Sequence, residues 1–253
     1  MITVFDPGGG SVADGPVTGQ ACRVVLVGTS HSGNIGAAAR AMKTMGLTGL
    51  DLVAPECEVD EQALAMAAGA RDVVESAVIH ETLAGALAES DLVLGLTARE
   101  RRDGVPALGP AEAATLIAAQ PGGQVSVLFG RERTGLTNDE LAFCHRLVHL
   151  PANPEYPSLN IAAAVQVMSY EIRCKRLGEP GGTTGSSSGE VIATGAHLEG
   201  LHTDLARLVE RTGYSANQPR EVLNRRLRNF INRSRPTRDE VNLLRGILKR
   251  IKH

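Results

Sequence analysis

Short apolar runs alternate with stretches of helical spacing along the first two thirds of the chain. The runs are RVVLVG (23–28), LDLVA (50–54), DLVLGLT (91–97), VSVLFG (125–130) and RLVHLP (146–151), with VVESAVIH (73–80) as a candidate sixth. Strands this uniformly apolar are usually covered on both faces. The pattern predicts an α/β fold with a mostly parallel sheet and helices on both faces, and it directs the search for chemistry to the loops after the strands.

Helical spacing dominates the last third of the chain. We expect one helix from Ser158 to about Arg176, with Ser158 as a candidate N-cap and Asn160 in the first turn. A segment rich in Gly, Ser and Thr follows, and then three amphipathic stretches at 197–214, 220–234 and 238–251. We therefore divide the chain into a flexible leader (1–20), an α/β domain (21–177), a linker (178–190) and a small α-helical domain (191–253).

Composition adds a charge asymmetry to this division. Residues 191–253 hold 13 Lys and Arg against 6 Asp and Glu, a net charge of +7, while the remaining residues hold 13 against 22, a net charge of -9. A basic lobe is an expected footprint of polyanion binding, although a solvated helical surface explains it equally well.

Other classes of protein are disfavoured by what the sequence lacks. No apolar run approaches the roughly 20 residues of a membrane span, and residues 1–20 have neither the basic start nor the apolar block of a signal peptide. We expect a cytoplasmic protein without membrane segments. Cysteines at 22, 57, 144 and 174 are widely scattered, which predicts buried free thiols and no structural metal.

The first glycine-rich turn, GTSHSG at 28–33, is not a nucleotide phosphate loop. It lacks the lysine and the hydroxyl residue that would follow, and its glycine spacing does not fit the dinucleotide fingerprint, although a nucleotide-dependent dehydrogenase stays open. We expect a helix opened by Asn34, with small residues on its first turns and Arg40 placed to hold a phosphate or a ribose. A surface salt bridge is the alternative role for Arg40.

Three motifs together carry a family resemblance. N-x-G-x-x-x-R (34–40), F-G-x-E-x-x-G-L (129–136) and a proline loop that ends in S-L-N-x-A-x-A-V (158–165) resemble, in order and spacing, the motifs of the SPOUT RNA methyltransferases. The resemblance covers residues 23 to about 176. The proline loop and the basic tail make the chain most similar to the branch that methylates the 2'-hydroxyl of the pyrimidine at tRNA anticodon-loop position 32.

The resemblance implies a C-terminal trefoil knot that binds S-adenosylmethionine, in a homodimer whose active site crosses the subunit interface. By the same resemblance, the cofactor pocket is formed by Leu96, Thr97, Ala98, Gly130, Leu150, Ser158, Leu159 and Asn160, with Gly130 allowing close approach. The catalytic set is Arg40, Asn34, Ser158 and Asn160. Arg40 remains protonated at neutral pH, so we expect it to grip a phosphate and stabilise the developing alkoxide rather than to remove the proton.

Further arginines are candidate RNA contacts. Arg99 and Arg101 follow the third clear strand, and a tail cluster comprises Arg225, Arg226, Arg228, Arg233, Arg235 and Arg238. Glu132 is expected to pair with a neighbouring arginine, and His31 and His149 to be polar loop residues. Two alternatives stay open besides tRNA methylation: ribose methylation of ribosomal RNA, and an RNA-binding protein with a vestigial pocket.

Overall fold

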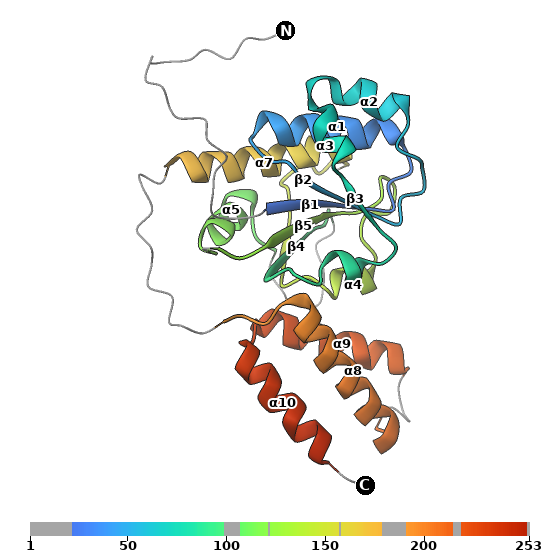
Figure 1. Cartoon of the computed structure of the whole chain (residues 1–253), viewed down its shortest axis with the longest axis vertical. Helices are drawn as coiled ribbons and strands as arrows, with labels where there is room; N and C mark the ends of the chain where they lie inside the picture. The colour runs from blue at the N-terminus through green and yellow to red at the C-terminus, as the bar shows by residue number, and fades with distance from the viewer. Residues whose placement is uncertain are drawn as a thin grey trace.

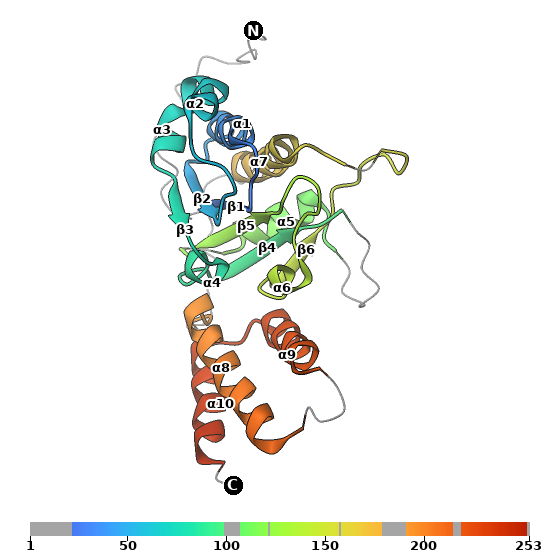
Figure 2. The same cartoon turned by 90° about the vertical axis from the view of Figure 1, so that its right-hand side faces the viewer.

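Six parallel strands form the sheet of the first domain, in the order β3-β2-β1-β5-β4-β6 (Figure 1, with β6 labelled in Figure 2). The structure is a computed structural model and describes residues 22–98, 107–120, 122–156, 158–178, 191–214 and 219–251. The strands are β1 (Cys22–Val27), β2 (Gly49–Val53), β3 (Val78–His80), β4 (Leu92–Leu96), β5 (Val125–Phe129) and β6 (Arg146–Val148). The predicted parallel α/β fold is confirmed, because every neighbouring pair runs parallel.

Helices cover both faces of the sheet, as predicted. One face carries α1 (Ser32–Thr44), α2 (Glu61–Ala67), α3 (Arg71–Glu75), α5 (Pro110–Ala118) and α7 (Ile161–Gly178), with the 3-10 turn Ala68–Ala70 between α2 and α3. The other face carries the one-turn helices α4 (Leu83–Ala86) and α6 (Asn138–Leu141). Alternate residues of β1 feed the two cores: Leu26 packs with α1, α5 and α7, and Val25 packs with α4 and α6.

A buried carboxylate lies on the face of the sheet that packs against α4 and α6. Asp51 of β2 is 1% exposed, and it accepts hydrogen bonds from Arg23 of β1 and lies 3.1 Å from Nε2 of His80 in β3. A buried charge is costly unless it is paired, so this cluster ties the three strands together on one side of the sheet.

The second domain consists of α8 (Gly195–Thr212), α9 (Arg220–Ser234) and α10 (Arg238–Arg250). Its small core joins Leu198 and Leu201 of α8 to Ile231 of α9 and Val241 of α10. The domain docks beneath the sheet, where α9 lies against α6 (Figure 2). None of the described helices combines the length and the apolar character that a membrane crossing requires.

Four local predictions need correction. The sixth strand is only Val78–His80, because residues 71–75 form α3 with Val73 and Val74 buried against the α1 side. Helix α1 begins at Ser32 rather than Asn34, since His31 is the last residue with extended backbone. Helix α7 begins at Ile161: the N-cap is Asn160, whose Oδ1 accepts the backbone N–H of Ala162 at 2.9 Å, and not Ser158.

The cysteine prediction is correct for only half of the set. Cys22 and Cys144 are buried, Cys57 is half-buried and Cys174 is exposed, and all four are free thiols. Burial raises the pKa of Cys22 to about 11, so this thiol is inert at neutral pH.

Candidate functional site

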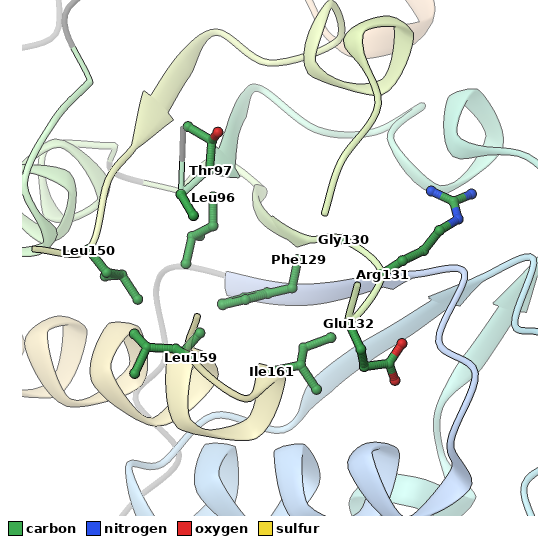
Figure 3. A pocket seen from close by; sticks show the side chains of 11 residues that line it. Leu96, Thr97, Phe129, Gly130, Arg131, Glu132, Leu150, Leu159 and Ile161 are labelled. Carbon is green, nitrogen blue, oxygen red and sulfur yellow. The ribbon is translucent and has the colours of Figure 1, made fainter. Parts of the chain in front are cut away.

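A cavity of about 110 Å³ lies at the carboxyl ends of the adjacent strands β5, β4 and β6 (Figure 3). Its lining comes from the loops after these strands and from the start of α7: Leu96, Thr97, Ala98, Phe129, Gly130, Arg131, Glu132, Leu150, Leu159, Ile161 and Ala164. Because parallel strands end at the same edge of a sheet, loops that are far apart in sequence meet there.

Main-chain hydrogen bonds fix the loops around β6. The N–H of Thr97 donates to the carbonyl oxygen of Val148 at 3.0 Å, and the N–H of Leu108 donates to Leu147 at 2.9 Å. The N–H of His149 then donates to Leu108, also at 2.9 Å. Residues 97 and 108, which both follow β4, are therefore bonded to the segment 147–149. These bonds hold Leu96 and Leu150 on one cavity wall.

Six of the eight residues predicted for the cofactor pocket line this cavity: Leu96, Thr97, Ala98, Gly130, Leu150 and Leu159. Ser158 and Asn160 are exposed beside it and do not line it. The role of Gly130 differs from the prediction, because a Cβ there would lie 2.2 Å from the backbone of Gly135 and Leu136. This glycine allows the chain to turn closely on itself, with its backbone at the cavity wall.

Sequence reasoning missed Phe129, Arg131, Glu132, Ile161 and Ala164 as lining residues. Phe129 and Arg131 flank the predicted Gly130, so a wider window on that loop would have included them. Ile161 and Ala164 are three residues apart at the start of α7 and therefore share one helical face, which the spacing of the third motif already contained.

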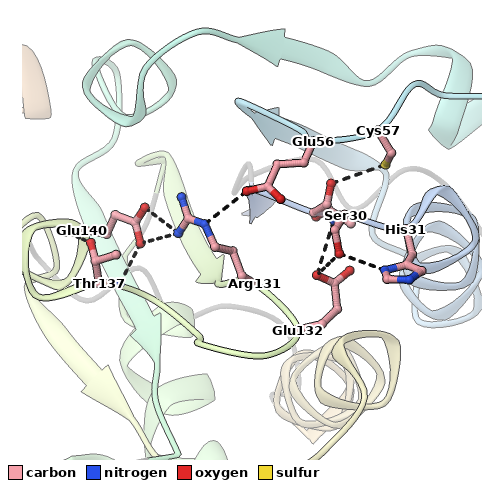
Figure 4. A network of polar contacts seen from close by, with 9 residues as sticks. Ser30, His31, Glu56, Cys57, Arg131, Glu132, Thr137 and Glu140 are labelled. Atoms are coloured by element: carbon pink, nitrogen blue, oxygen red, sulfur yellow. Dashed lines mark hydrogen bonds and ion pairs between the residues drawn. The ribbon is translucent and has the colours of Figure 1, made fainter.

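Hydrogen bonds through Asn34 link the three motifs beside the cavity, and Figure 4 shows the contact of Glu132 with Ser30. Glu132 accepts hydrogen bonds from Nδ2 of Asn34 at 2.9 Å and from Oγ of Ser30 at 3.1 Å, and Nδ2 of Asn160 donates to Oδ1 of Asn34 at 3.2 Å. Partial burial opposes ionisation, but the hydrogen bonds from Asn34 and Ser30 outweigh it and lower the pKa of Glu132. The predicted arginine partner of Glu132 is wrong: amide and hydroxyl donors hold it.

Arg131, the neighbour of Glu132, fastens the same turn from the other side. Its Nη1 donates to Glu140 of α6 at 2.9 Å, and its Nε lies 3.7 Å from a carboxylate oxygen of Glu56 (Figure 4). The guanidinium lies against Gly28, where a Cβ would be 2.6 Å from its Nε, and Gly28 has a φ of +60°. The glycine after β1 therefore makes room for an arginine and not for a phosphate.

The predicted catalytic residues divide into two groups. Asn34 and Asn160 belong to the hydrogen-bond network of one protomer. Arg40 lies exposed on α1 and has no hydrogen bond or ion pair with any described residue, and Ser158 is exposed at the end of the proline loop.

His31 and His149 are loop residues, as predicted. His31 contacts Ser30, and His149 contacts the carbonyl oxygen of Thr97. Arg99 and Arg101 lie outside the described residues.

The arginines of the basic tail are not equivalent. Arg228 forms two hydrogen bonds with Glu199, at 2.6 and 2.9 Å, and stacks 4.4 Å from the ring centre of Phe143. Arg225 contacts Asp139 of α6 at 3.2 Å. Arg226 is exposed and has no ion-pair or hydrogen-bond partner among the described residues, so its charge is the one of the three that faces solvent unpaired.

The cavity suits a ligand that is part apolar and part cationic. Leucine, phenylalanine, isoleucine and alanine side chains form most of its wall, and the ionised Glu132 supplies a negative charge at one end. These properties match S-adenosylmethionine, which combines an aromatic base with a sulfonium and an amino group. Within the described residues, no three His, Cys, Asp or Glu side chains are grouped to hold a metal ion.

Two family models match the chain. The SpoU rRNA methylase family matches residues 21–170, and the C-terminal domain of the tRNA methyltransferase TrmJ matches residues 196–253. A curated relative from Salmonella typhimurium, tRNA (cytidine/uridine-2'-O-)-methyltransferase TrmJ, is 46% identical over 92% of this chain and 96% of its own length. The resemblance seen in the three motifs is confirmed.

Solved structures agree with these matches. The crystal structure of TrmJ from Z. mobilis ZM4 has a TM-score of 0.80 and 34% identity, and covers 90% of this chain and 97% of its own. The SpoU methyltransferase AviRb from Streptomyces viridochromogenes, solved with the cofactor AdoMet, shares the fold at a TM-score of 0.52 and 19% identity, over 65% of this chain and 64% of its own. The chain therefore belongs to the SpoU methylase family and carries a C-terminal domain of the TrmJ type.

Proposed function

We propose that this protein transfers the methyl group of S-adenosylmethionine to a ribose 2'-hydroxyl of tRNA. The observation that carries the proposal is the convergence of the loops after β4, β5 and β6 on one cavity, with hydrogen bonds from Asn34 to Glu132 and from Asn160 to Asn34 joining the three motifs beside it. The 46% identity to a tRNA (cytidine/uridine-2'-O-)-methyltransferase over nearly the whole chain supports tRNA as the substrate.

In this proposal, the cavity wall and the network have separate tasks. Leu96, Leu150 and Leu159 exclude water from the methyl donor, and backbone groups of residues 97–98 and 130 meet the edge of its base. S-adenosylmethionine supplies an electrophilic methyl group when bound. Asn160 and Ser158 orient the ribose hydroxyl at the mouth of the cavity, where in-line alignment lowers the barrier.

Arg40 acts on the substrate rather than on the donor. Its guanidinium holds a positive charge at all physiological pH values, so it grips a phosphate next to the target ribose and stabilises the alkoxide as the O–H bond breaks. The proton passes to water or to a phosphate oxygen. Because Arg40 has no anionic partner among the described residues, its charge is available for this role.

We further propose that two copies form the active unit, with Arg40 of one copy facing the cavity of the other. Support comes from α7, the helix whose first turn lines the cavity, because Val167, Tyr170 and Leu177 are exposed along one of its faces at 37%, 52% and 66%. Tyr170→Glu should yield monomers in analytical ultracentrifugation and abolish transfer, with Tyr214→Glu, on the second domain, as the control. An active monomer would refute this arrangement.

We also propose that the first domain contains a trefoil knot and that the protein is located in the cytoplasm. The parallel pairing of Leu108 with Val148, at the edge of β6, supports a chain that passes β6 before the 150–160 loop returns, as a knot requires. The coordinates of a crystal structure, traced from residue 97 to α7, test the knot. Immunofluorescence or fractionation of the native host tests the location.

Labelled S-adenosylmethionine and total RNA test the reaction itself. We expect the label in the tRNA fraction and, by mass spectrometry of the nucleosides, on the 2'-oxygen of the pyrimidine at position 32. Ribosomal RNA is the second candidate substrate, because the matching family is described as an rRNA methylase family. Label confined to 23S RNA would establish that alternative, and label in neither RNA would leave an RNA-binding protein with an inactive pocket.

Arg40→Ala tests the assigned chemistry. We expect unchanged S-adenosylmethionine affinity by calorimetry and a turnover number lower by about 10²–10³-fold, since one charge that stabilises the transition state is lost. Arg71→Ala, which removes another exposed arginine of the same domain, serves as the control. Normal turnover of the Arg40 variant would show that the residue is misassigned.

A further inference from the structure

The segment around α6 lies between the second domain and the cavity-lining loops (Figure 2). On the side of the second domain, Asn232 of α9 is 3% exposed and donates from Nδ2 to the carbonyl oxygen of Ala142 at 2.8 Å. Its Oδ1 lies 3.1 Å from Nε2 of His202 on α8. Because each of these bonds, if broken, leaves a buried polar group without a partner, this amide holds α8 and α9 against the end of α6.

On the side of the cavity, α6 holds the turn that follows β5. Glu140 accepts from Nη1 of Arg131 at 2.9 Å, and it also accepts from the N–H of Thr137 at 2.7 Å in the capping box of α6. Arg131 and its neighbour Glu132 line the cavity. One glutamate thus joins the start of α6 to the cavity wall.

The same segment also packs under β4. A Cβ on Gly95 would lie 2.5 Å from Sγ of Cys144 and 3.2 Å from Cδ2 of Leu141, so α6 and the residues after it touch the strand directly. Gly95 precedes the cavity-lining Leu96. Displacement of α6 would therefore reach two of the three cavity loops.

A helix of one turn depends on its surroundings for its position. Residues 138–141 are too few to form a helix stable by itself, because nucleation costs more than a single turn returns. Burial of Leu141 and Ala142 provides part of the support, and the bond from Asn232 provides support from outside the domain.

We propose that the second domain positions the methyl-donor cavity through α6, and that Asn232 is the positioning residue. The docked domain then does more than add surface for RNA: it keeps the 131–142 segment in the conformation that shapes the cavity. This inference rests on the proposed function only for the identity of the ligand.

Asn232→Ala in the full-length protein tests the inference, with Asn229→Ala, exposed on the same helix, as the matched control. By hydrogen exchange without ligand, amides of residues 131–142 should exchange about 5–10-fold faster in the Asn232 variant and at the wild-type rate in the control. The dissociation constant for S-adenosylmethionine, measured without tRNA, should rise by a similar factor, and KM for the cofactor should rise while kcat at saturation is retained.

Asn232→Asp keeps an acceptor for His202 and removes the donor to Ala142, so it tests the bond between the domains if the alanine variant unfolds its own domain. Faster exchange of residues 131–142 in this variant supports the inference. Wild-type exchange and affinity in both variants would overturn it. A wild-type protein that does not bind S-adenosylmethionine would refute the proposed function, and the exchange measurement would still decide the positioning role.

Discussion

The two domains use their apolar side chains differently. In the α/β domain, both faces of the sheet are covered, and Leu26, Leu52 and Leu128 are completely buried. In the second domain, Leu201 is completely buried, but Leu243 and Ile247 of α10 are 66% and 51% exposed. A unit of about 60 residues has little interior to begin with. The first domain therefore carries its own core, whereas the stability of the second domain depends on what it docks against.

The largest effect is expected where a buried charge loses its partner. Arg23→Leu leaves the Asp51 carboxylate, 1% exposed, without its guanidinium, and should lower the free energy of unfolding by about 3–5 kcal/mol. The matched change in the second domain is Arg245→Leu, which removes one of the two arginine partners of the more accessible Asp204 (13% exposed) and should cost about 1 kcal/mol. Urea unfolding, followed by circular dichroism, measures the free energy of unfolding of both variants. Equal losses would show that a buried ion pair matters no more in the first domain than in the second.

A smaller but more local effect is expected from Leu201→Ala. Truncation of this buried side chain should cost about 3 kcal/mol, and the loss should fall on α8–α10 rather than on the sheet. Hydrogen exchange by mass spectrometry should show faster exchange in residues 191–251 and wild-type protection in β1, β4 and β5. Leu243→Ala, on the exposed face, is the control. Uniform acceleration throughout the chain would mean that the two domains unfold together.

Acid should weaken the second domain through His202. Burial, followed by the nearby Arg228, lowers the pKa of this imidazole below its ordinary value of 6.5. The unfolded chain therefore binds more protons than the folded one below pH 6.5, and stability decreases as pH falls through that value. Unfolding at pH 7.5 and 5.5 measures the loss. His202→Gln should reduce it, His31→Gln should not, and an identical loss in both variants would exclude His202 as the cause.

The smallest effect concerns the surface of the second domain. Arg226→Ala should lower the slope of log affinity for tRNA against log salt by about one, because one phosphate contact is lost, and should leave stability unchanged. Arg228→Ala should reduce stability as well, since it removes the pair with Glu199 and the stacking on Phe143. Wild-type salt dependence in the Arg226 variant would argue that tRNA binds elsewhere.

Apolar patterning was sufficient to predict the sheet, and the family resemblance of the three motifs implied most of the residues that line the cavity. Mostly apolar runs bounded by turn residues, such as 125–130, favour a strand covered on both sides, and the strand ends then bring Leu96, Gly130 and Leu150 to one edge. Short segments that mix apolar and polar residues were harder to assign to a strand or a helix. Val73 and Val74 suit a strand or a helix equally, and only their packing beneath α1 decides for α3.

The sequence could not predict which of several similar polar side chains makes a given hydrogen bond. Ser158 and Asn160 are both good N-cap residues, and the bond to Ala162 decides for Asn160. Nothing in the periodicity of α9 shows that Asn232 bonds to Ala142, 90 positions earlier, or that Glu132 takes an amide rather than a guanidinium. Such contacts depend on how distant segments meet.

The strand order has a consequence for synthesis of the chain. β1 pairs with β2 on one side and with β5 on the other, and about 100 residues separate β1 from β5. At about 5–20 residues per second, the ribosome needs roughly 5–20 s to make that stretch, during which one edge of β1 has no partner. The middle of the sheet therefore closes late in synthesis, only when β5 emerges.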